Sequence, residues 1–257
     1  MWGIALKATW KQNFHMMGRY LFNTLSSFVT LYIVFALLFY GTKSIGAGTM
    51  NLGDTLEGVF AGYVTWMLAI MGCTDLAYTI TNEAQSGTLE QICLSPLGYW
   101  QILLFNQSFH LLTSVLVIGL ITVSMSLTTG LVIHLDLVSV VPIVLALYLQ
   151  SLGLGLVLAG LALIYKRIQA FFQVVQFALI GIFLIPLDAF PGARYLPLAE
   201  GRKVLQQVLI GGIRIWQARW TDLGPMFGAT ALYISVGVAC FTMAENRARS
   251  RGLLGQY

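Results

Sequence analysis

The sequence Glu83-Ala84-Gln85-Ser86-Gly87-Thr88-Leu89-Glu90-Gln91-Ile92-Cys93-Leu94-Ser95-Pro96 is a polar segment between two long apolar runs. Gly87 favours a break in the helix that emerges from the first run, because glycine adopts backbone conformations that other residues avoid. Thr88 and Gln91 form the capping-box pattern that begins a helix, and Ser95 before Pro96 starts the next one. A helix this short needs support from another surface, since isolated helices below about 12 to 15 residues are marginal in water.

The composition of the whole chain is that of a membrane protein. Of its 257 residues, 58% are hydrophobic and only 9% are charged, and the mean hydropathy is +0.80. A soluble domain carries about 25% charged residues, so this chain could not cover a water-facing surface. Its net charge of +4 suits membrane topology better than phosphate binding, because the basic residues lie beside apolar runs. We therefore expect an integral membrane protein that does not bind nucleic acid.

Six apolar runs are long enough to cross the bilayer as helices, which takes about 20 residues each. Gly58, Gly62 and Gly72 in the second run permit close helix contact. The predicted fold is an all-α integral membrane protein with six transmembrane helices in residues 21–257. The predicted spans are residues 21–39, 56–80, 99–127, 138–165, 168–187 and 223–243.

Two segments outside the spans have helical patterns of their own. In residues 1–20, the apolar residues Trp2, Leu6, Trp10, Phe14 and Met17 recur at intervals of four and three beside a basic face. This pattern predicts an interfacial amphipathic helix; a plain extension of the first span is the alternative. Residues 188–222 are too apolar for an ordinary loop and too interrupted by proline and glycine for a span. They predict two short re-entrant or interfacial helices on the outer face, over residues 198–210 and 213–220.

The distribution of Lys and Arg sets the orientation. With both termini cytoplasmic, eight of the 14 basic residues lie inside. This bias is weak, but a short loop and the C-terminal tail hold the positions that count most in the positive-inside rule. The loop 81–98 is then cytoplasmic. The eight residues are Lys7, Lys11, Arg19, Lys166, Arg167, Arg247, Arg249 and Arg251.

Polar residues within the spans are candidates for function. Asp75 lies near the inner end of the second span and His110 lies inside the third. Ionisable groups in spans are often functional, but Asp75 is near enough to an interface to hydrate, and His110 has no acidic residue in its own span. We therefore favour structural pairing or packing for both. Gln169, Gln173 and Gln176 form a polar stripe on the fifth span, which either faces a translocation path or, slightly favoured, hydrogen-bonds a neighbouring helix.

The pattern Glu83-x-x-x-Gly87-Thr88-Leu89-Glu90-x-x-x-x-Ser95-Pro96 resembles the signature of the permease subunits of type-2 ABC transporters, the exporter branch of that superfamily. In that family a short coupling helix lies across the cytoplasmic end of the bundle and fits a groove on the ATP-hydrolysing subunit. The family also carries an interfacial N-terminal helix, a re-entrant pair between its fifth and sixth spans, and a tail similar to residues 244–257. The resemblance covers nearly the whole chain.

The resemblance implies a multi-pass protein of the plasma (inner) membrane that works as a dimer with two ABC ATPase subunits. These subunits would bind ATP and Mg, so no cofactor is expected on this chain. Glu83 and Glu90 are expected to make polar contacts to the ATPase, Leu89 and Ile92 to form an apolar plug, and Gly87 to set the angle. The full set of expected contact residues is Glu83, Gly87, Thr88, Leu89, Glu90, Gln91 and Ile92.

Other chemistry finds little support in the sequence. There is no G-x-x-x-x-G-K-[ST], H-E-x-x-H or G-x-S-x-G pattern, and so no ATPase, metalloprotease or hydrolase motif. Cys73, Cys93 and Cys240 lack the spacing of a disulfide framework or a metal site. Because these catalytic motifs and metal-site spacings are missing, we expect a transport subunit rather than an enzyme. The aromatic, weakly charged spans suit an amphiphile such as a drug-like compound or lipid, or a lipid-linked glycan. A stand-alone secondary carrier or channel and a membrane scaffold are the alternatives, and homodimer or heterodimer is left open.

Overall fold

The structure is a computed structural model that describes residues 2–46, 52–88, 91, 99–165, 168–184 and 196–250. These residues form eight α-helices and one 3-10 turn, and no strand occurs among them. The Leu89, Glu90 and Ile92 positions of the predicted ATPase contact lie outside the described residues. The elements are α1 (Trp2–Arg19), α2 (Leu21–Gly46), α3 (Leu52–Gln85), α5 (Tyr99–Thr129), α6 (Leu137–Ile164), α7 (Gln169–Leu184), α8 (Ala199–Leu209), η2 (Ile215–Gln217) and α9 (Trp220–Ser250).

Five of these helices are long and apolar enough to cross a membrane, which gives the chain the character of an all-α multi-pass membrane protein. The described part of the predicted fifth span is α7, which has 16 residues. Its apolar part, Gln169–Ile180, is shorter than the other candidates. The five candidate spans are Leu21–Ser44, Leu56–Gln85, Trp100–Thr129, Leu137–Ile164 and Trp220–Ser250.

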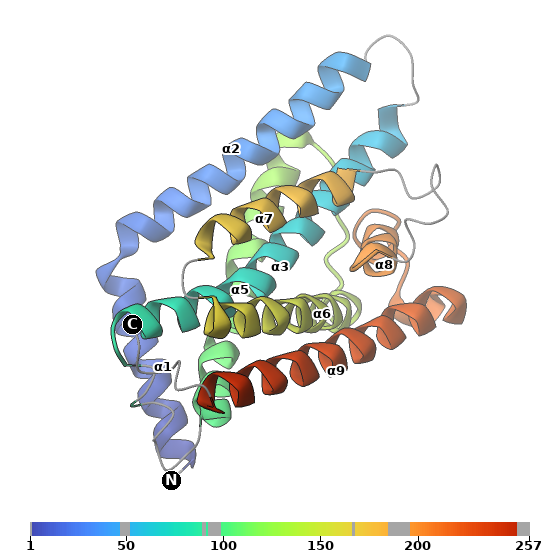
Figure 1. The fold of residues 1–257 in the computed structure, drawn as a ribbon. Helices are drawn as coiled ribbons and strands as arrows, with labels where there is room; N and C mark the ends of the chain where they lie inside the picture. The colour runs from blue at the N-terminus through green and yellow to red at the C-terminus, as the bar shows by residue number, and fades with distance from the viewer. Residues whose placement is uncertain are drawn as a thin grey trace.

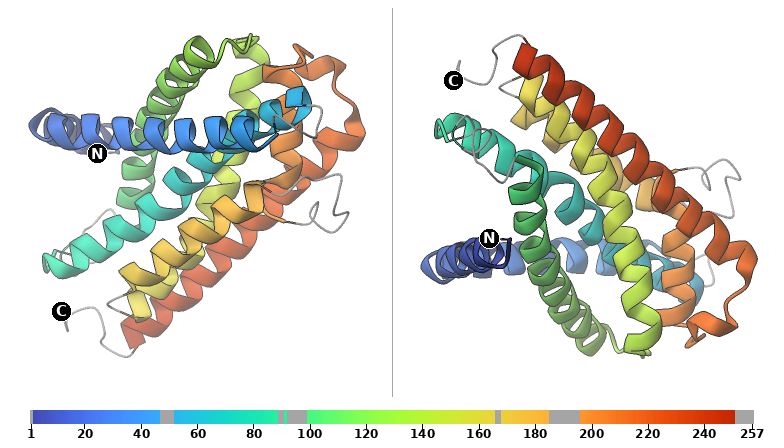
Figure 2. Two further views of the ribbon diagram at one scale, coloured as in Figure 1. Left: turned by 90° about the horizontal axis from the view of Figure 1, so that it is seen from above. Right: turned by 90° about the horizontal axis from the view of Figure 1, so that it is seen from below.

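Helix α6 lies at the centre of the bundle, with α3 on one side and α9 on the other (Figure 2). Small residues allow this packing. A Cβ atom at Gly155 of α6 would lie 2.6 Å from the carbonyl oxygen of Gly72 in α3. On the other side of α6, Gly153 meets Gly237 of α9 at similarly close range. In the membrane, where lipid is as apolar as the side chains, such close backbone approach is a main source of helix association.

Helices α1 and α2 cross the other side of the bundle, away from α6 and α9 (Figure 1). Only Tyr20 separates α1 from α2, and the backbone hydrogen bonds Tyr20 N–H to Met16 O (3.0 Å) and Thr24 N–H to Tyr20 O (3.1 Å) carry the helix almost continuously through the junction. Helix α1 packs on α5, where Trp10 Nε1 donates to Ser108 Oγ at 3.0 Å. Whether α1 lies in the headgroup layer stays a prediction.

Helix α8 caps one end of the bundle, which we call the α8 end. One face of α8 is buried against α3, α6 and α9. The loop before α6 joins it there, because His134 N–H donates to Leu209 O at 2.7 Å. This helix accounts for the first of the two short helices expected in residues 188–222. Over the second, residues 213–220, the backbone forms only the 3-10 turn η2 before α9 begins at Trp220.

Candidate functional site

The opposite end of the bundle holds the predicted coupling loop, and we call it the Gly87 end. Helix α3 stops there because Gly87 takes a left-handed conformation, with φ +69°. Gly87 N–H donates to Ala84 O at 3.1 Å, and Thr88 N–H donates to Glu83 O at 3.0 Å. This pair of hydrogen bonds is a Schellman motif, in which a glycine closes the helix and satisfies carbonyls of its last turn. The predicted helix break at Gly87 is therefore confirmed.

The other described residues of the loop lie beside this turn. Thr88 Oγ1 also donates to Glu83 O, at 3.2 Å, so both hydrogen-bond donors of Thr88 help to close α3; the capping box with Gln91 stays a prediction. Gln91 is helical and exposed. Glu83 is half-buried, and its Oε2 atom has no hydrogen-bond partner among the described residues. A buried acceptor left unpaired is costly, which makes Glu83 ready to accept a hydrogen bond from a partner.

Several helices meet at the Gly87 end. The last turns of α3, α6 and α9 and the first turn of α7 lie on the same side in all views of the ribbon (Figures 1 and 2). At the end of α9, Arg249 Nη2 pairs with Glu245 Oε1 at 2.7 Å. A force applied at this end would therefore reach four helices of the bundle.

The glutamine stripe on α7 lies beside the face that packs on α3. Phe172 is fully buried, and its ring meets that of Tyr78 edge-on at 5.4 Å between centroids. Gln169 and Gln173 are exposed and Gln176 is half-buried. The only hydrogen bond that reaches the stripe among the described residues is from Trp66 Nε1 to the Gln176 backbone oxygen, at 3.5 Å. The three glutamines thus lie along one helix, and among the described residues no hydrogen bond joins their amides to another polar side chain.

The structure brings Asp75 and His110 together, which the sequence did not predict. Asp75 Oδ2 lies 3.7 Å from His110 Nδ1, and the two side chains are 30% and 31% exposed. Asp75 precedes the end of α3 by ten residues, which is about 15 Å of helix. The pairing expected for Asp75 therefore exists, and its partner comes from α5 rather than from a nearby turn.

Polar groups extend from this pair into the bundle. Tyr148 of α6 is 2% exposed and lies within electrostatic range of Asp75. Its hydroxyl donates to Gln107 Oε1 at 3.4 Å. Gln107 stands one turn before His110 on α5, is 6% exposed, and has no partner for its Nε2 atom among the described residues. Three helices thus contribute to one polar cluster, which we call the Asp75 cluster: Asp75, Gln107, His110 and Tyr148.

A second polar region lies at the α8 end. A cavity of about 500 Å³ opens between α8 and the segment that leads into α9. The ion pair between Lys203 Nζ and Asp222 Oδ1, at 2.9 Å, joins its two walls. The rest of its polar lining is Glu200, Gln207, Gln217, Arg219 and Thr221. No group of three residues suited to hold a metal ion occurs in the described parts of the chain.

Comparison with known proteins adds no assignment. No model of a known protein family matches the chain, and no curated protein sequence matches it.

Proposed function

We propose that this chain is the transmembrane subunit of a type-2 ABC exporter in the plasma (inner) membrane, with both termini cytoplasmic. Two copies, or one copy and a homologue, form the pathway, and two ABC ATPase subunits bind ATP and Mg. Each copy contributes six spans, α7 with the residues that follow it being the fifth, and a re-entrant segment between the last two. The substrate is an amphiphile, either a drug-like compound or a lipid, or else a lipid-linked glycan.

The observation that carries this proposal is the Schellman motif at Gly87. It stops α3 within the polar segment whose sequence resembles the coupling signature, and it turns the chain away from the helix axis. Gln91, the one described residue after Thr88 in this segment, is helical and exposed. A sharp stop of a long buried helix at an exposed polar segment is the arrangement that a lever between two subunits needs.

The mechanism is mechanical. ATP-driven closure of the two ATPase subunits displaces the segment after Thr88, and Gly87 transmits the displacement to α3. Because α3 packs on both α6 and α7, a tilt of α3 moves the centre of the bundle and the glutamine stripe together. Gln169, Gln173 and Gln176 line the path between the two copies in this scheme, and Glu83 and Glu90 hold the ATPase through polar contacts.

The uncovered surface of α2 supports assembly into a dimer. Only 6% of its most apolar stretch is buried within one chain. Leu25, Val29, Ile33 and Leu37 recur every four residues and are at least half exposed. Lipid covers such a stripe in a monomer, and a second copy covers part of it in a dimer.

The test is purification of the tagged chain from its native membranes, followed by an ATPase assay. We expect a P-loop ATPase subunit in equal amount, with ATP turnover that is inhibited by vanadate. Glu90→Arg should strongly reduce the co-purified ATP turnover. Reversing the charge at a polar contact between two subunits replaces an attraction with an unfavourable interaction, which weakens the contact. Glu200→Arg makes the same charge change at the α8 end and should leave turnover unchanged.

Two results would overturn the proposal. A chain that purifies without any ATPase and still moves solute in vesicles would be a secondary carrier or channel, the second candidate. The Asp75–His110 pair favours that candidate, since ionisable pairs within spans occur in proton-coupled carriers. Equal turnover in the Glu90→Arg and Glu200→Arg complexes would show that the polar segment is an ordinary loop.

A further inference from the structure

Asp75 lies in an unusual setting for a carboxylate. No Lys or Arg occurs anywhere in α3, α5, α6 or α7, so none of these four helices supplies a fixed positive charge to it. Helix α1, which touches α5 at Phe109, carries Lys7 and Lys11, and both are exposed. Among the described residues, the ion pair at Asp75 is with His110 alone.

The pair with His110 is loose and open. At 3.7 Å the two atoms are farther apart than in a hydrogen bond, and nearly a third of each side chain is accessible. Burying a carboxylate in a span without a matching cation is expensive. Among the described residues, Asp75 thus lacks a closely matched cation. Because nearly a third of its side chain is accessible, a cation from outside the chain can reach the carboxylate.

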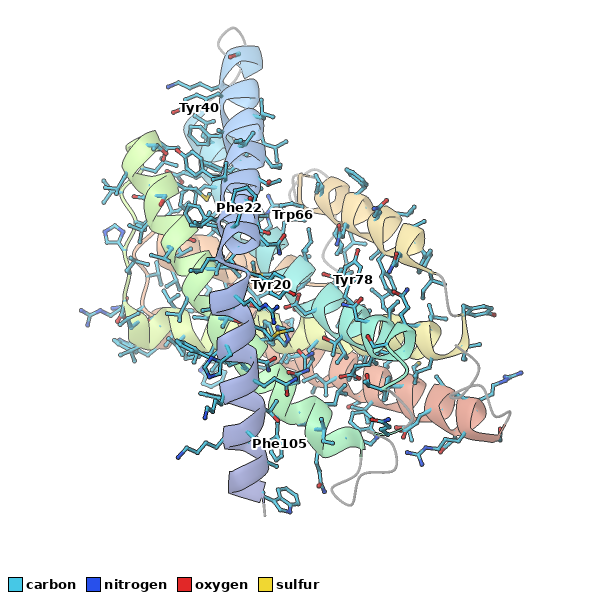
Figure 3. All side chains as sticks on the ribbon, turned by 90° about the vertical axis from the view of Figure 1, so that its left-hand side faces the viewer. Tyr20, Phe22, Tyr40, Trp66, Tyr78 and Phe105 are labelled. Atoms are coloured by element: carbon cyan, nitrogen blue, oxygen red, sulfur yellow. The ribbon has the colours of Figure 1, made fainter. Side chains whose placement is uncertain are left out.

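The surroundings of Asp75 define what this partner is. Gln107, one turn from His110 on the same helix, is more than nine-tenths buried, and its Nε2 donor has no partner among the residues that the structure describes. Aromatic rings occupy both helices near the pair. Phe109 adjoins His110 with 6.4 Å between ring centroids, and Tyr78 follows Asp75 by about one turn of α3, on the side between α2 and α7 (Figure 3). Both rings pack on other helices, Phe109 on Trp10 of α1 and Tyr78 on Phe172 of α7, and so contribute an apolar surround. An accessible carboxylate in an apolar surround attracts a weakly hydrated cation, which is cheaper to desolvate than a strongly hydrated one.

We propose that Asp75, with His110 and Gln107 beside it, binds the positively charged headgroup of an amphiphile, an amine or quaternary ammonium. The carboxylate supplies the counter-charge, and Gln107 Nε2 donates to a hydroxyl or carbonyl oxygen next to the cationic centre. The apolar tail lies along the uncovered surfaces of the spans. This site narrows the substrate class of the proposed exporter to cationic amphiphiles. That the bound amphiphile is also transported rests on the proposed function.

The experiment measures binding of radiolabelled dodecyltrimethylammonium to the full chain in lipid nanodiscs by equilibrium dialysis, with empty nanodiscs subtracted. Dodecanol and dodecyl sulfate, which share the tail but differ in headgroup charge, serve as competitors. We expect the ammonium compound to bind, and the alcohol and the sulfate to compete at least about tenfold less well. That factor corresponds to the low end of a charge-assisted contact.

Variants locate the site. Asp75→Asn should weaken binding by roughly ten- to hundredfold, whereas Asp75→Glu, which keeps the charge, should retain it within a few-fold. Glu57→Gln removes a carboxylate from the other half of α3 and should bind as the wild type does. If Asp75→Asn fails to fold, as judged by circular dichroism and gel filtration, the headgroup preference of the wild type still tests whether the chain binds a cationic amphiphile.

Equal competition by all three headgroups, or unchanged binding by a folded Asp75→Asn chain, would overturn this inference. The assay uses the chain alone, so its outcome is independent of any ATPase. A cation preference without a co-purifying ATPase would reject the exporter and keep the site. Coupled ATPase activity without a cation preference would keep the exporter and reject the cation site.

Discussion

Helices α6 and α2 have similar lengths and hydropathies but very different surroundings. Their spans have 28 and 24 residues with mean hydropathies of 2.1 and 1.9, yet 56% of the most apolar stretch of α6 is buried within the chain and only 6% of that of α2. Both helices are long and apolar enough to cross a membrane. Small residues decide which one becomes the centre, because Gly153 and Gly155 let α6 approach α9 and α3 at backbone distance.

The contact surface of α2 is aromatic and narrow by comparison. Phe35 packs edge-on against Phe60 of α3 with 6.1 Å between centroids, and the hydroxyl of Tyr63 donates to Leu31 O. Large rings hold the two helices apart, so the rest of α2 remains uncovered. Helix α6 therefore organises the packing of the chain, whereas α2 leaves most of its surface to lipid or to a second copy.

The largest effect is expected from filling the glycine contacts of α6. Gly155→Leu would press a side chain into the backbone of Gly72 and Cys73, and neither helix can move without losing the other contacts of α3. We expect a loss of about 3 kcal/mol, at the upper end of overpacking, seen as early unfolding in a detergent–SDS titration. A Cβ at Gly41 on α2 has nothing within 4 Å. The Gly41→Leu chain should therefore unfold at the same SDS fraction as the wild type. Equal loss in both would remove the distinction between the two helices.

A smaller effect is expected from emptying space instead of filling it. Leu147 of α6 is fully buried beneath Gly201 of α8, whereas Leu37 of α2 is 70% exposed. Leu147→Ala should cost about 2 kcal/mol, the low end for such truncations, because lipid replaces water as the reference for the lost side chain. Leu37→Ala should stay within about 0.5 kcal/mol. The same SDS titration measures both, and a loss at Leu37 equal to that at Leu147 would place α2 in the core.

The smallest effect concerns the polar contact that fixes α1, and through it the start of α2. Asn13 Nδ2 donates to Asn106 Oδ1 of α5 at 2.6 Å. Asn106→Ala should cost about 0.6 kcal/mol, the average for an interhelical hydrogen bond in a membrane, and should speed hydrogen exchange in α1 without changing α6. Asn23→Ala removes an exposed amide from α2 and serves as the control. Faster exchange in α6 would show that the two regions are not independent.

The sequence predicted the features that depend on local chemistry. Apolar run length placed the start of the first span at Leu21, where α2 begins. Gly87 was predicted as a helix break because few other residues adopt a positive φ, and the structure has it at +69°. Gly72 was expected at a close helix contact and lies in one, whereas a Cβ at Gly58 would meet only Arg202, at 3.7 Å.

The features that depend on how helices turn toward one another were not predictable. Asp75 and His110 lie on different helices, and no periodicity within either helix sets the rotation that makes them face each other. The end of α9 was also missed. Charged residues after Met243 indicated a tail, but the Glu245–Arg249 pair, four residues apart, supports the helix to Ser250.

Cross-linking can show whether the Gly87 end contacts an ATPase subunit, as we propose. A photo-cross-linker on Gln91→Cys, in a chain whose three cysteines are replaced by alanine, should join the chain to the co-purified ATPase. The same reagent on Gln217→Cys at the α8 end should give no such product. A product from position 91 that changes in yield when vanadate traps the closed ATPase is the result we predict. No product at 91, or equal yields at 91 and 217, would contradict the account.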